Sequence, residues 1–202
     1  MQEELLDILD ENGNATGKQK PRGIVHKDGD WHRSFHLWIV NGNDVLLQRR
    51  SAKKDLEPNK VDVTVGGHYR AAEGLEQVLR ETEEEIGLFV RPEEISYLGQ
   101  NKVERLYDDA IDREFQEIYI LEKNQPLDYY YLNCAEVFAI YEVNIDKLIS
   151  LYEHGGFAPA NGWDCQQRTN NALLVELDLI TQARADTLKT LKKVKDWMLK
   201  TT

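Results

Sequence analysis

The sequence predicts an α/β fold in which a mixed β-sheet packs against helices, followed by a helical C-terminal extension. Two features favour this fold class: alternating apolar runs typical of strands, and amphipathic stretches with the helical period of about 3.6 residues. The 202 residues suit a single domain. We expect its core at about 30–145, an N-terminal strand and loop at 1–30, and C-terminal helices at about 145–202.

The strands are predicted from alternation and from the turns that separate them. The turn Asn41-Gly42-Asn43-Asp44 lies between two apolar runs, which is the pattern of a β-hairpin. A further alternating run begins at Val61 and is ended by Gly66-Gly67. The predicted strands cover residues 5–10, 34–40, 44–49, 61–65, 95–104, 113–122 and 136–143.

The helices are predicted from apolar residues that recur at helical spacing. Leu75, Val78, Leu79 and Ile86 do so, and Gly87 follows as a helix stop. A second apolar stripe, over 188–198, is either intramolecular core or the face of a possible homodimer. The predicted helices cover 75–86, 145–154 and 182–200. The predicted loops cover 17–30, with a brief extended piece at Ile24 and Val25, then 51–60 and 155–171.

Charge and composition limit the partners and the location. A formal net charge of -11 repels polyanions, so a nucleic-acid polymer is not expected as a partner. The chain contains no apolar run of membrane-spanning length and its acidic N-terminus has no signal-peptide pattern. Cys134 and Cys165 are too few for a disulfide framework or a cysteine-based zinc site. We therefore expect reduced cysteines and a cytoplasmic location.

The segment with the most chemical information runs from Gly66 to Leu88. Glu81, Glu84 and Glu85 stand at i, i+3 and i+4, so they share one helix face. Three like charges there weaken a helix unless a cation lies between them, and Mg²⁺ prefers such oxygen ligands. The alternative is an ordinary solvated face. The strand and glycine pair that precede the helix favour a metal–diphosphate site.

This segment resembles the Nudix box, G-x5-E-x7-R-E-U-x-E-E-x-G-U, where U is a bulky apolar residue. Gly67, Glu73 and the run from Arg80 to Leu88 match it. Six residues rather than seven separate Glu73 from Arg80, and Thr82 is less apolar than its position requires. The resemblance implies a Nudix-type α/β/α sandwich. It also implies a hydrolase that uses Mg²⁺ or Mn²⁺ to cleave a diphosphate linkage in a small phosphorylated substrate, such as a nucleoside-diphosphate compound.

The same resemblance implies roles for single residues. Glu81, Glu84 and Glu85 would be metal ligands, with the carbonyl of Gly67 as a further ligand. Arg80 would pair with a glutamate and hold it in its ligating geometry. The alternative for Arg80 is an ordinary surface pair with a glutamate one turn away.

The catalytic set is expected to include a carboxylate that takes a proton from water. Glu84 and Glu85 are the candidates from the box, beside Arg80. Glu117, in the predicted strand 113–122, is the candidate from outside it, and solvated strand polarity is its alternative.

Substrate phosphates require cations. Arg49, Arg50, Lys53 and Lys54 form the strongest basic cluster, and arginine binds phosphate through two hydrogen bonds. Arg49 and Arg50, together with Glu73 and His68, are therefore predicted to contact substrate, although a plain surface role for the cluster stays open. His26, His32, His36 and His68 lack the spacing of a zinc site, and we expect them to be buried, hydrogen-bonded or on the substrate side.

The flanking segments resemble one branch of the family, that of isopentenyl-diphosphate isomerase. Leu6 to Gly13, His32 to His36 and Leu46 to Ser51 carry the resemblance. The isomerase needs a cysteine two residues before the histidine of the box segment, and Gly66 stands there instead. The chain also keeps the full set of box glutamates. Hydrolysis is therefore favoured over isomerisation and over a catalytically silent binding protein.

Overall fold

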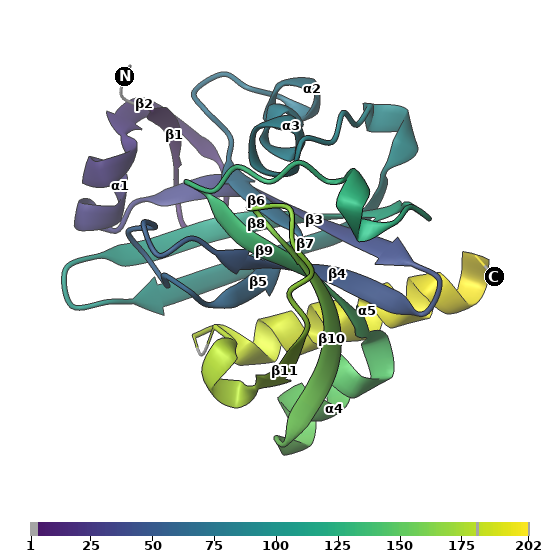
Figure 1. Cartoon of the computed structure of the whole chain (residues 1–202). Coiled ribbons are helices and arrows are strands. Elements are labelled where there is room, and N and C mark those ends of the chain that lie inside the picture. Colours follow the sequence, from purple (N-terminus) through teal and green to yellow (C-terminus); the bar gives the residue numbers. More distant parts are fainter. Residues whose placement is uncertain (1–3, 181, 202) are drawn as a thin grey trace.

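A computed structural model describes residues 4–180 and 182–201, which form one mixed sheet flanked by helices (Figure 1). Strand β3 (Trp31–Asn41) is at the centre of this sheet. It pairs antiparallel with β4 (Asp44–Arg50) and parallel with β8 (Ile111–Glu122). The predicted hairpin about the Asn41–Asp44 turn is therefore confirmed.

The other strands extend the sheet on both sides of β3. One path through the sheet runs β11-β10-β9-β4-β3-β1-β2, while β5 pairs with β4, β6 with β3, and β7 with β8. These strands are β1 (Leu5–Leu9), β2 (Ala15–Pro21), β5 (Val61–Val63), β6 (Val65–His68), β7 (Ser96–Leu106), β9 (Val137–Asn144), β10 (Phe157–Asp164) and β11 (Ala172–Val175).

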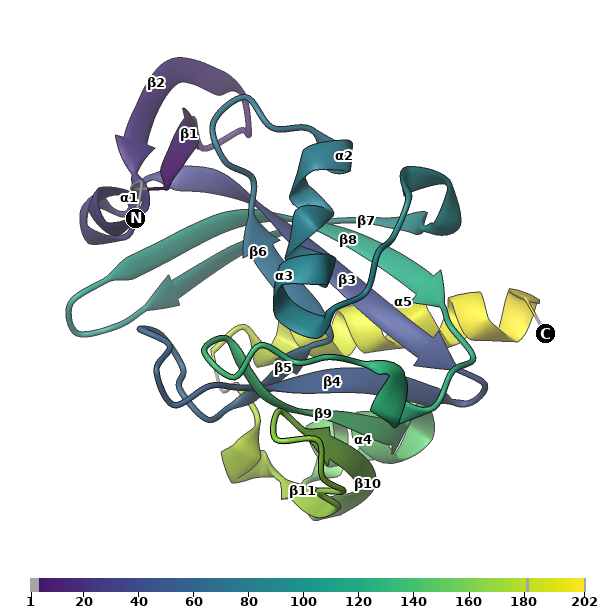
Figure 2. The same ribbon diagram turned by 45° about the horizontal axis from the view of Figure 1, so that its top comes forward.

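Helices cover the two faces of the sheet (Figures 1 and 2). On one face lie α2 (Leu75–Val78) and α3 (Arg80–Ile86), and their apolar residues join a core with β3 and β4. On the other face lie α4 (Ile145–His154) and α5 (Arg184–Thr201). A short helix, α1 (Arg22–Asp28), lies beside β1 and β2, and single 3-10 turns occur at Pro92–Glu94, Leu127–Tyr129 and Glu176–Asp178. The predicted α/β/α sandwich is confirmed.

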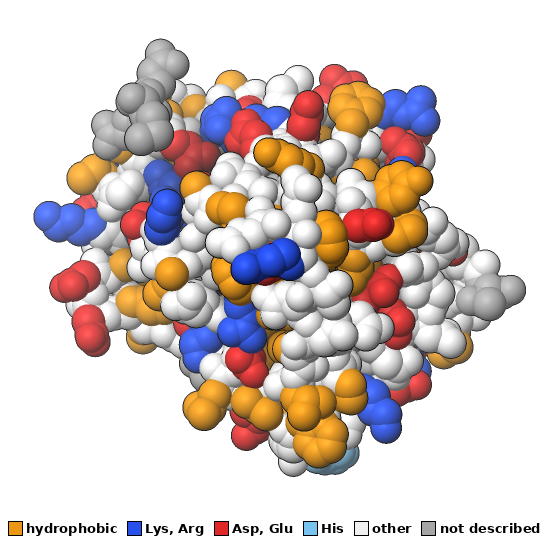
Figure 3. All heavy atoms as spheres, in the orientation of Figure 1, with side chains coloured by type: hydrophobic (Ala, Val, Ile, Leu, Met, Phe, Trp, Pro, Cys, Tyr) orange, Lys and Arg blue, Asp and Glu red, His pale blue; other side chains and the backbone are white. Residues whose placement is uncertain are grey.

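The C-terminal helices agree closely with their predicted ranges. The stripe on α5 is intramolecular core, because Leu191, Val194 and Met198 are buried against the sheet. Apolar side chains are exposed elsewhere, over β10 and β11 in the lower part of Figure 3. Phe157, Leu173 and Val175 are examples. The possible homodimer stays a prediction.

The predicted N-terminal loop over 17–30 is wrong in both halves. Its first half belongs to β2, an edge strand whose residues are mostly exposed, so no apolar alternation marks it. Its second half is helix α1, where an extended piece was expected at Ile24 and Val25. The helix ends at Gly29, which adopts a left-handed conformation.

The predicted loop over 155–171 is also wrong, because it contains β10. The residues of β10 that face inward are small or polar: Ala158, Ala160, Gly162 and Asp164. A Cβ on Gly162 would lie 1.9 Å from the carbonyl oxygen of Asn170. The close approach of the chain therefore requires small residues there, and these hide the apolar alternation by which strands are recognised.

Two smaller corrections concern the box segment. Gly66 and Gly67 do not end a strand but lie within β6, paired with β3. The predicted helix 75–86 is interrupted at Leu79, next to the position where the box is one residue short. Removing one residue turns a continuous helix by about 100°, and the interruption falls there. The buried hydroxyl of Thr82 donates to the carbonyls of Leu79 and Leu88, which explains its polarity.

Cys134 and Cys165 form a disulfide, whereas reduced cysteines were expected. The bond links the segment before β9 to the end of β10. Among the described helices, none is long and apolar enough to cross a bilayer.

Candidate active site

One cleft of about 720 Å³ brings the box glutamates together with the end of β6. Glu81, Glu84 and Glu85 line it from α3, and Gly67 and His68 line it from β6. The helix spacing anticipated from the sequence thus delivers three carboxylates to one cavity. Glu85 is buried, Glu81 is mostly buried and Glu84 is half exposed.

The glycine at position 67 is needed for this arrangement. A Cβ at Gly67 would lie 2.6 Å from the carboxyl carbon of Glu81, which is closer than real contacts allow. At Gly66 the nearest atom to such a Cβ is 3.4 Å away, which is an ordinary contact. Gly67 therefore lets the backbone of β6 approach the Glu81 carboxylate directly.

Burial changes the protonation of two of these glutamates. Burial raises the pKa of Glu81 to about 8; Arg80 opposes this rise, and Glu85 and Glu84 add to it. Burial also raises the pKa of Glu85 to about 7, against the effect of Lys54 and Arg50. Glu81 and Glu85 therefore need additional positive charge beside them for both carboxyls to be ionised at neutral pH.

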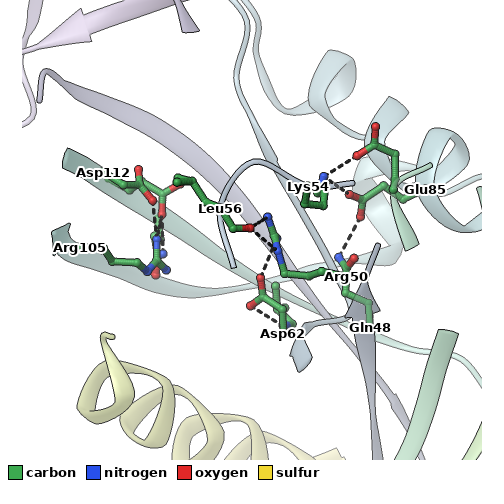
Figure 4. A network of polar contacts seen from close by, with 12 residues as sticks. Gln48, Arg50, Lys54, Leu56, Asp62, Glu85, Arg105 and Asp112 are labelled. Atoms are coloured by element: carbon green, nitrogen blue, oxygen red, sulfur yellow. Dashed lines mark hydrogen bonds and ion pairs between the residues drawn. The ribbon is translucent and has the colours of Figure 1, made fainter. Parts of the chain in front are cut away.

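Two residues that the sequence did not single out as ligand supports hold Glu85 (Figure 4). Gln48, on β4, donates from Nε2 to Oε2 of Glu85 at 3.1 Å. Lys54 Nζ lies 3.8 Å from Oε1 of Glu85 and 2.5 Å from Oε2 of Glu136. Gln48 directly follows the apolar run of β4 and is fully buried. A polar amide continuing such a run was the signal available in the sequence.

Arg80 lies within a group of carboxylates rather than in solvent. Its Nη2 is 2.8 Å from Oε1 of Glu81, and its Nε is 3.7 Å from Oε1 of Glu84. Its Nη1 is 3.4 Å from Oε2 of Glu73. The guanidinium side chain is only 18% exposed, which distinguishes it from a plain surface pair.

Besides Arg80, three residues predicted for the site lie outside the lining of the cleft. Glu117 lies on β8 and accepts hydrogen bonds from Arg33, Tyr69 and Tyr119. Because strand residues alternate between faces, Glu117 points away from the face that carries Glu114.

Arg49 and Glu73 are the other two. Arg49 pairs with Asp178 at 2.9 Å, on the side of β4 away from the cleft. Glu73 accepts a hydrogen bond from the backbone of Arg70 within its own turn and pairs with Arg80. It therefore supports the arginine rather than facing substrate.

Arg50 and His68 do line the cleft. Arg50 is engaged with Asp62 at 3.1 Å and with the Leu56 carbonyl oxygen, as Figure 4 shows. Lys53 also lines the cleft, and within residues 4–180 and 182–201 it makes no ion pair. It is the most available cation for a phosphate.

Comparison with known proteins places the chain in a family. The family model described as the NUDIX domain matches residues 30–147. The chain belongs to the Nudix hydrolase family. An uncharacterised Nudix hydrolase of Clostridium acetobutylicum is 38% identical over 152 residues, which are 73% of each protein. A crystal structure of DR0079 from Deinococcus radiodurans superposes with a TM-score of 0.54 at 21% identity, covering 73% of this chain and 87% of that one, and this likeness shows a shared fold.

One of the relatives carries the name of the isomerase that the flanking segments resemble. Isopentenyl-diphosphate Delta-isomerase 2 of Photorhabdus laumondii is 27% identical over 146 residues, 68% of this chain and 82% of its own length. In the present chain Gly66 lines the cleft, and both cysteines are consumed in the disulfide. No thiol of the described residues is available for isomerase chemistry.

The residues on α3 fit the divalent cation that a Nudix hydrolase implies. They supply carboxylate oxygens, which are hard ligands of the kind Mg²⁺ and Mn²⁺ prefer. The raised pKa values of Glu81 and Glu85 mark a place where an added cation favours ionisation. Because Gly67 has no Cβ, the space beside the Glu81 carboxylate is free of a side chain from β6.

Proposed function

We propose that the chain hydrolyses a diphosphate linkage in a small phosphorylated molecule, with Mg²⁺ or Mn²⁺ held by Glu81, Glu84 and Glu85. The observation that carries the proposal is the meeting of these carboxylates with Gly67 in one cleft. A bound divalent cation would neutralise phosphate oxygens and lower the pKa of a coordinated water.

The residues of the chain divide the remaining work. Glu84 is the candidate to take a proton from water, because its carboxylate lines the cleft and is 49% exposed. Glu85 is buried and held by Gln48, which suits a ligand of fixed orientation. Arg80 holds Glu81 and Glu84 in place.

The opposite wall supplies positive charge for the substrate. Lys53 and Lys54 follow β4 and line the cleft with Arg50. Lys54 is tied to Glu136 and Arg50 to Asp62, so Lys53 is the candidate to bind a distal phosphate. The net charge of -11 does not prevent this, because the cations are local to the site.

The test is turnover of a panel of diphosphate compounds with Mg²⁺ or Mn²⁺, comparing Glu84→Gln with Glu83→Gln. Both glutamates lie on α3 and are exposed, but only Glu84 lines the cleft. We expect Glu84→Gln to lose most of the metal-dependent release of phosphorylated products and Glu83→Gln to retain it. Equal activity of the two variants would remove Glu84 from the mechanism.

The panel also separates the rival functions. A silent binding protein releases no product from any compound with either metal. An isomerase exchanges protons on an allylic diphosphate while the diphosphate stays intact. Either result contradicts the proposed hydrolysis.

A further inference from the structure

Three arginines converge on the carboxylate of Glu4, the residue that directly precedes β1. The Glu4 side chain lines the cleft and is 28% exposed. Its Oε1 lies 3.7 Å from Nε of Arg70 and 3.8 Å from Nη2 of Arg80. Its Oε2 lies 3.9 Å from Nε of Arg22. Guanidinium groups from α1, from α3 and from the loop between β6 and α2 thus surround one carboxylate.

The fold fixes the backbone on both sides of this carboxylate. The amide nitrogen of Arg22, at the start of α1, donates to the carbonyl oxygen of Glu4 at 2.8 Å. The amide nitrogen of Ala71 donates to the carbonyl oxygen of Leu5, also at 2.8 Å. Leu6, the next residue of β1, is fully buried. Glu4 is therefore held beside the loop that leads from β6 into α2 (Figure 2).

Arg70 and Arg80 each join Glu4 to a different glutamate of α3. Nη2 of Arg80, 3.8 Å from Glu4, is also 2.8 Å from Oε1 of Glu81. Arg70 approaches Glu4 through Nε and Glu84 through Nη2, each at 3.7 Å. The two arginines thus form two bridges from one outer carboxylate to two of the proposed metal ligands.

Arg80 is held in place by charge rather than by hydrogen bonds. Its Nε, Nη1 and Nη2 are buried, and none of them makes a hydrogen bond to a described residue. The carboxylates around it are those of Glu4, Glu73, Glu81 and Glu84. A divalent cation on Glu81 and Glu84 would repel the guanidinium and attract both carboxylates to itself. Glu4 and Glu73 are the carboxylates that would then still attract Arg80.

We infer that Glu4 is a positioning residue for the metal site. It attracts Arg70 and Arg80 away from the ligating oxygens, which leaves Glu81 and Glu84 free to bind the cation. Groups behind metal ligands set the orientation of those ligands in this way. This role rests on the proposed function, because it takes the α3 glutamates as the ligands of the divalent cation. Glu4 itself is not a ligand and acts through the two arginines.

The test measures Mn²⁺ binding to the metal-free, full-length chain through the electron paramagnetic resonance signal of free Mn²⁺, so it needs no substrate. Glu85→Gln identifies the part of the binding that belongs to the α3 glutamates. We expect Glu4→Gln to weaken that part by about 10-fold, the lower end of the 10–100-fold effect of groups behind metal ligands. Glu11→Gln is the matched control, because Glu11 is exposed in the turn between β1 and β2 and does not line the cleft.

A double variant shows whether Glu4 acts through an arginine. Once Arg70→Gln has removed one of the two bridges, Glu4→Gln should weaken Mn²⁺ binding less than it does in the unchanged chain. Melting temperatures of the metal-free Glu4→Gln and Glu11→Gln chains should differ little, because ion pairs that stay partly exposed contribute little to stability.

Turnover supplies a second measurement. The Mg²⁺ concentration that gives half-maximal turnover should rise in Glu4→Gln by the same factor as the Mn²⁺ dissociation constant. The inference is overturned if Glu4→Gln binds Mn²⁺ as Glu11→Gln does, or if the effects of Glu4→Gln and Arg70→Gln are additive. A purely structural role of Glu4 would lower turnover at every Mg²⁺ concentration and leave the Mn²⁺ affinity unchanged. Weaker Mn²⁺ binding in Glu4→Gln, with no hydrolysis by the unchanged chain, would refute only the hydrolytic proposal.

Discussion

The two polar clusters that share the cleft are built in opposite ways. The glutamate cluster comes from one helical turn, Glu81 to Glu85, and is held by Arg80 and Gln48. The histidine cluster consists of His26, His32, His68 and Asp112, which come from α1, β3, β6 and β8. One is a local motif and the other is an assembly of distant segments.

The two clusters also differ in their electrostatics. Burial raises the pKa values of Glu81 and Glu85 in the glutamate cluster. In the histidine cluster Arg105 lies beside both Asp112 and Glu114 and compensates their charge. The carboxyls of the first cluster therefore gain from additional positive charge, whereas those of the second already have an arginine beside them.

The strongest separation of the two clusters should come from Glu85→Gln. We expect Mg²⁺-dependent turnover to fall by about 100-fold or more, because even groups that only orient a metal ligand contribute 10–100-fold. The metal-free protein should melt at the same or a higher temperature, because a buried charge is removed. Turnover and melting of the same preparation measure both. A lower melting temperature would show that Glu85 is a structural residue.

Gly67→Ala should damage the glutamate site through its shape. The new Cβ would displace the Glu81 carboxylate, and a shift of about 1 Å at a catalytic group can cost 10²-fold in rate. Gly66→Ala is the matched control, because its Cβ meets only an ordinary contact. Similar kinetics for the two variants would contradict the close approach of β6 to Glu81.

Opening the disulfide should affect the glutamate side more than the histidine side. The residue before Cys134, Asn133, donates from its backbone to the Glu85 carbonyl, and Cys134 itself accepts from Ser51. We expect Cys165→Ser to lower the free energy of unfolding by about 2–4 kcal/mol. Turnover should fall a few-fold, and denaturant unfolding of the same preparation measures the loss of stability. Turnover equal to that of the unchanged chain would show that the disulfide does not position the glutamate side.

The last expected effect is one of pH on the stability of the metal-free protein rather than on turnover. The pKa values of Glu81 and Glu85 are about 8 and about 7 in the fold, against an ordinary value of 4.5. The folded state then binds more protons, so the free energy of unfolding falls as pH rises from about 4.5 to 8. Each kcal/mol corresponds to about 2–4 °C in melting temperature.

Added Mg²⁺ should reduce this pH dependence, because a bound cation favours the ionised carboxylates. Melting curves from pH 5 to 8, with and without Mg²⁺, measure the difference. Melting temperatures that rise with pH in the metal-free protein would contradict the direction of both pKa shifts.

Several features of the fold were readable from the sequence because their signals are local. The hairpin of β3 and β4, helix α4 and the amphipathic α5 follow from turn residues and apolar spacing. Strands β2 and β10 were missed, because an exposed edge strand and a strand with small inward residues carry no apolar alternation.

The residues of the candidate site also differ in whether a local sequence signal reveals them. The spacing of Glu81, Glu84 and Glu85 is enough to place them on one face of a helix, whatever that helix packs against. Spacing could not show that Glu117 and Arg49 point away from the cleft, since a single step along a strand reverses the face.

The amino-acid order alone thus specified the family and the three-glutamate face, because a helix brings residues three and four positions apart together wherever it lies. The histidine cluster, the disulfide and the approach of Gly67 to Glu81 arise only on folding. They depend on which strands become neighbours in the sheet, and that is settled by packing over the whole core.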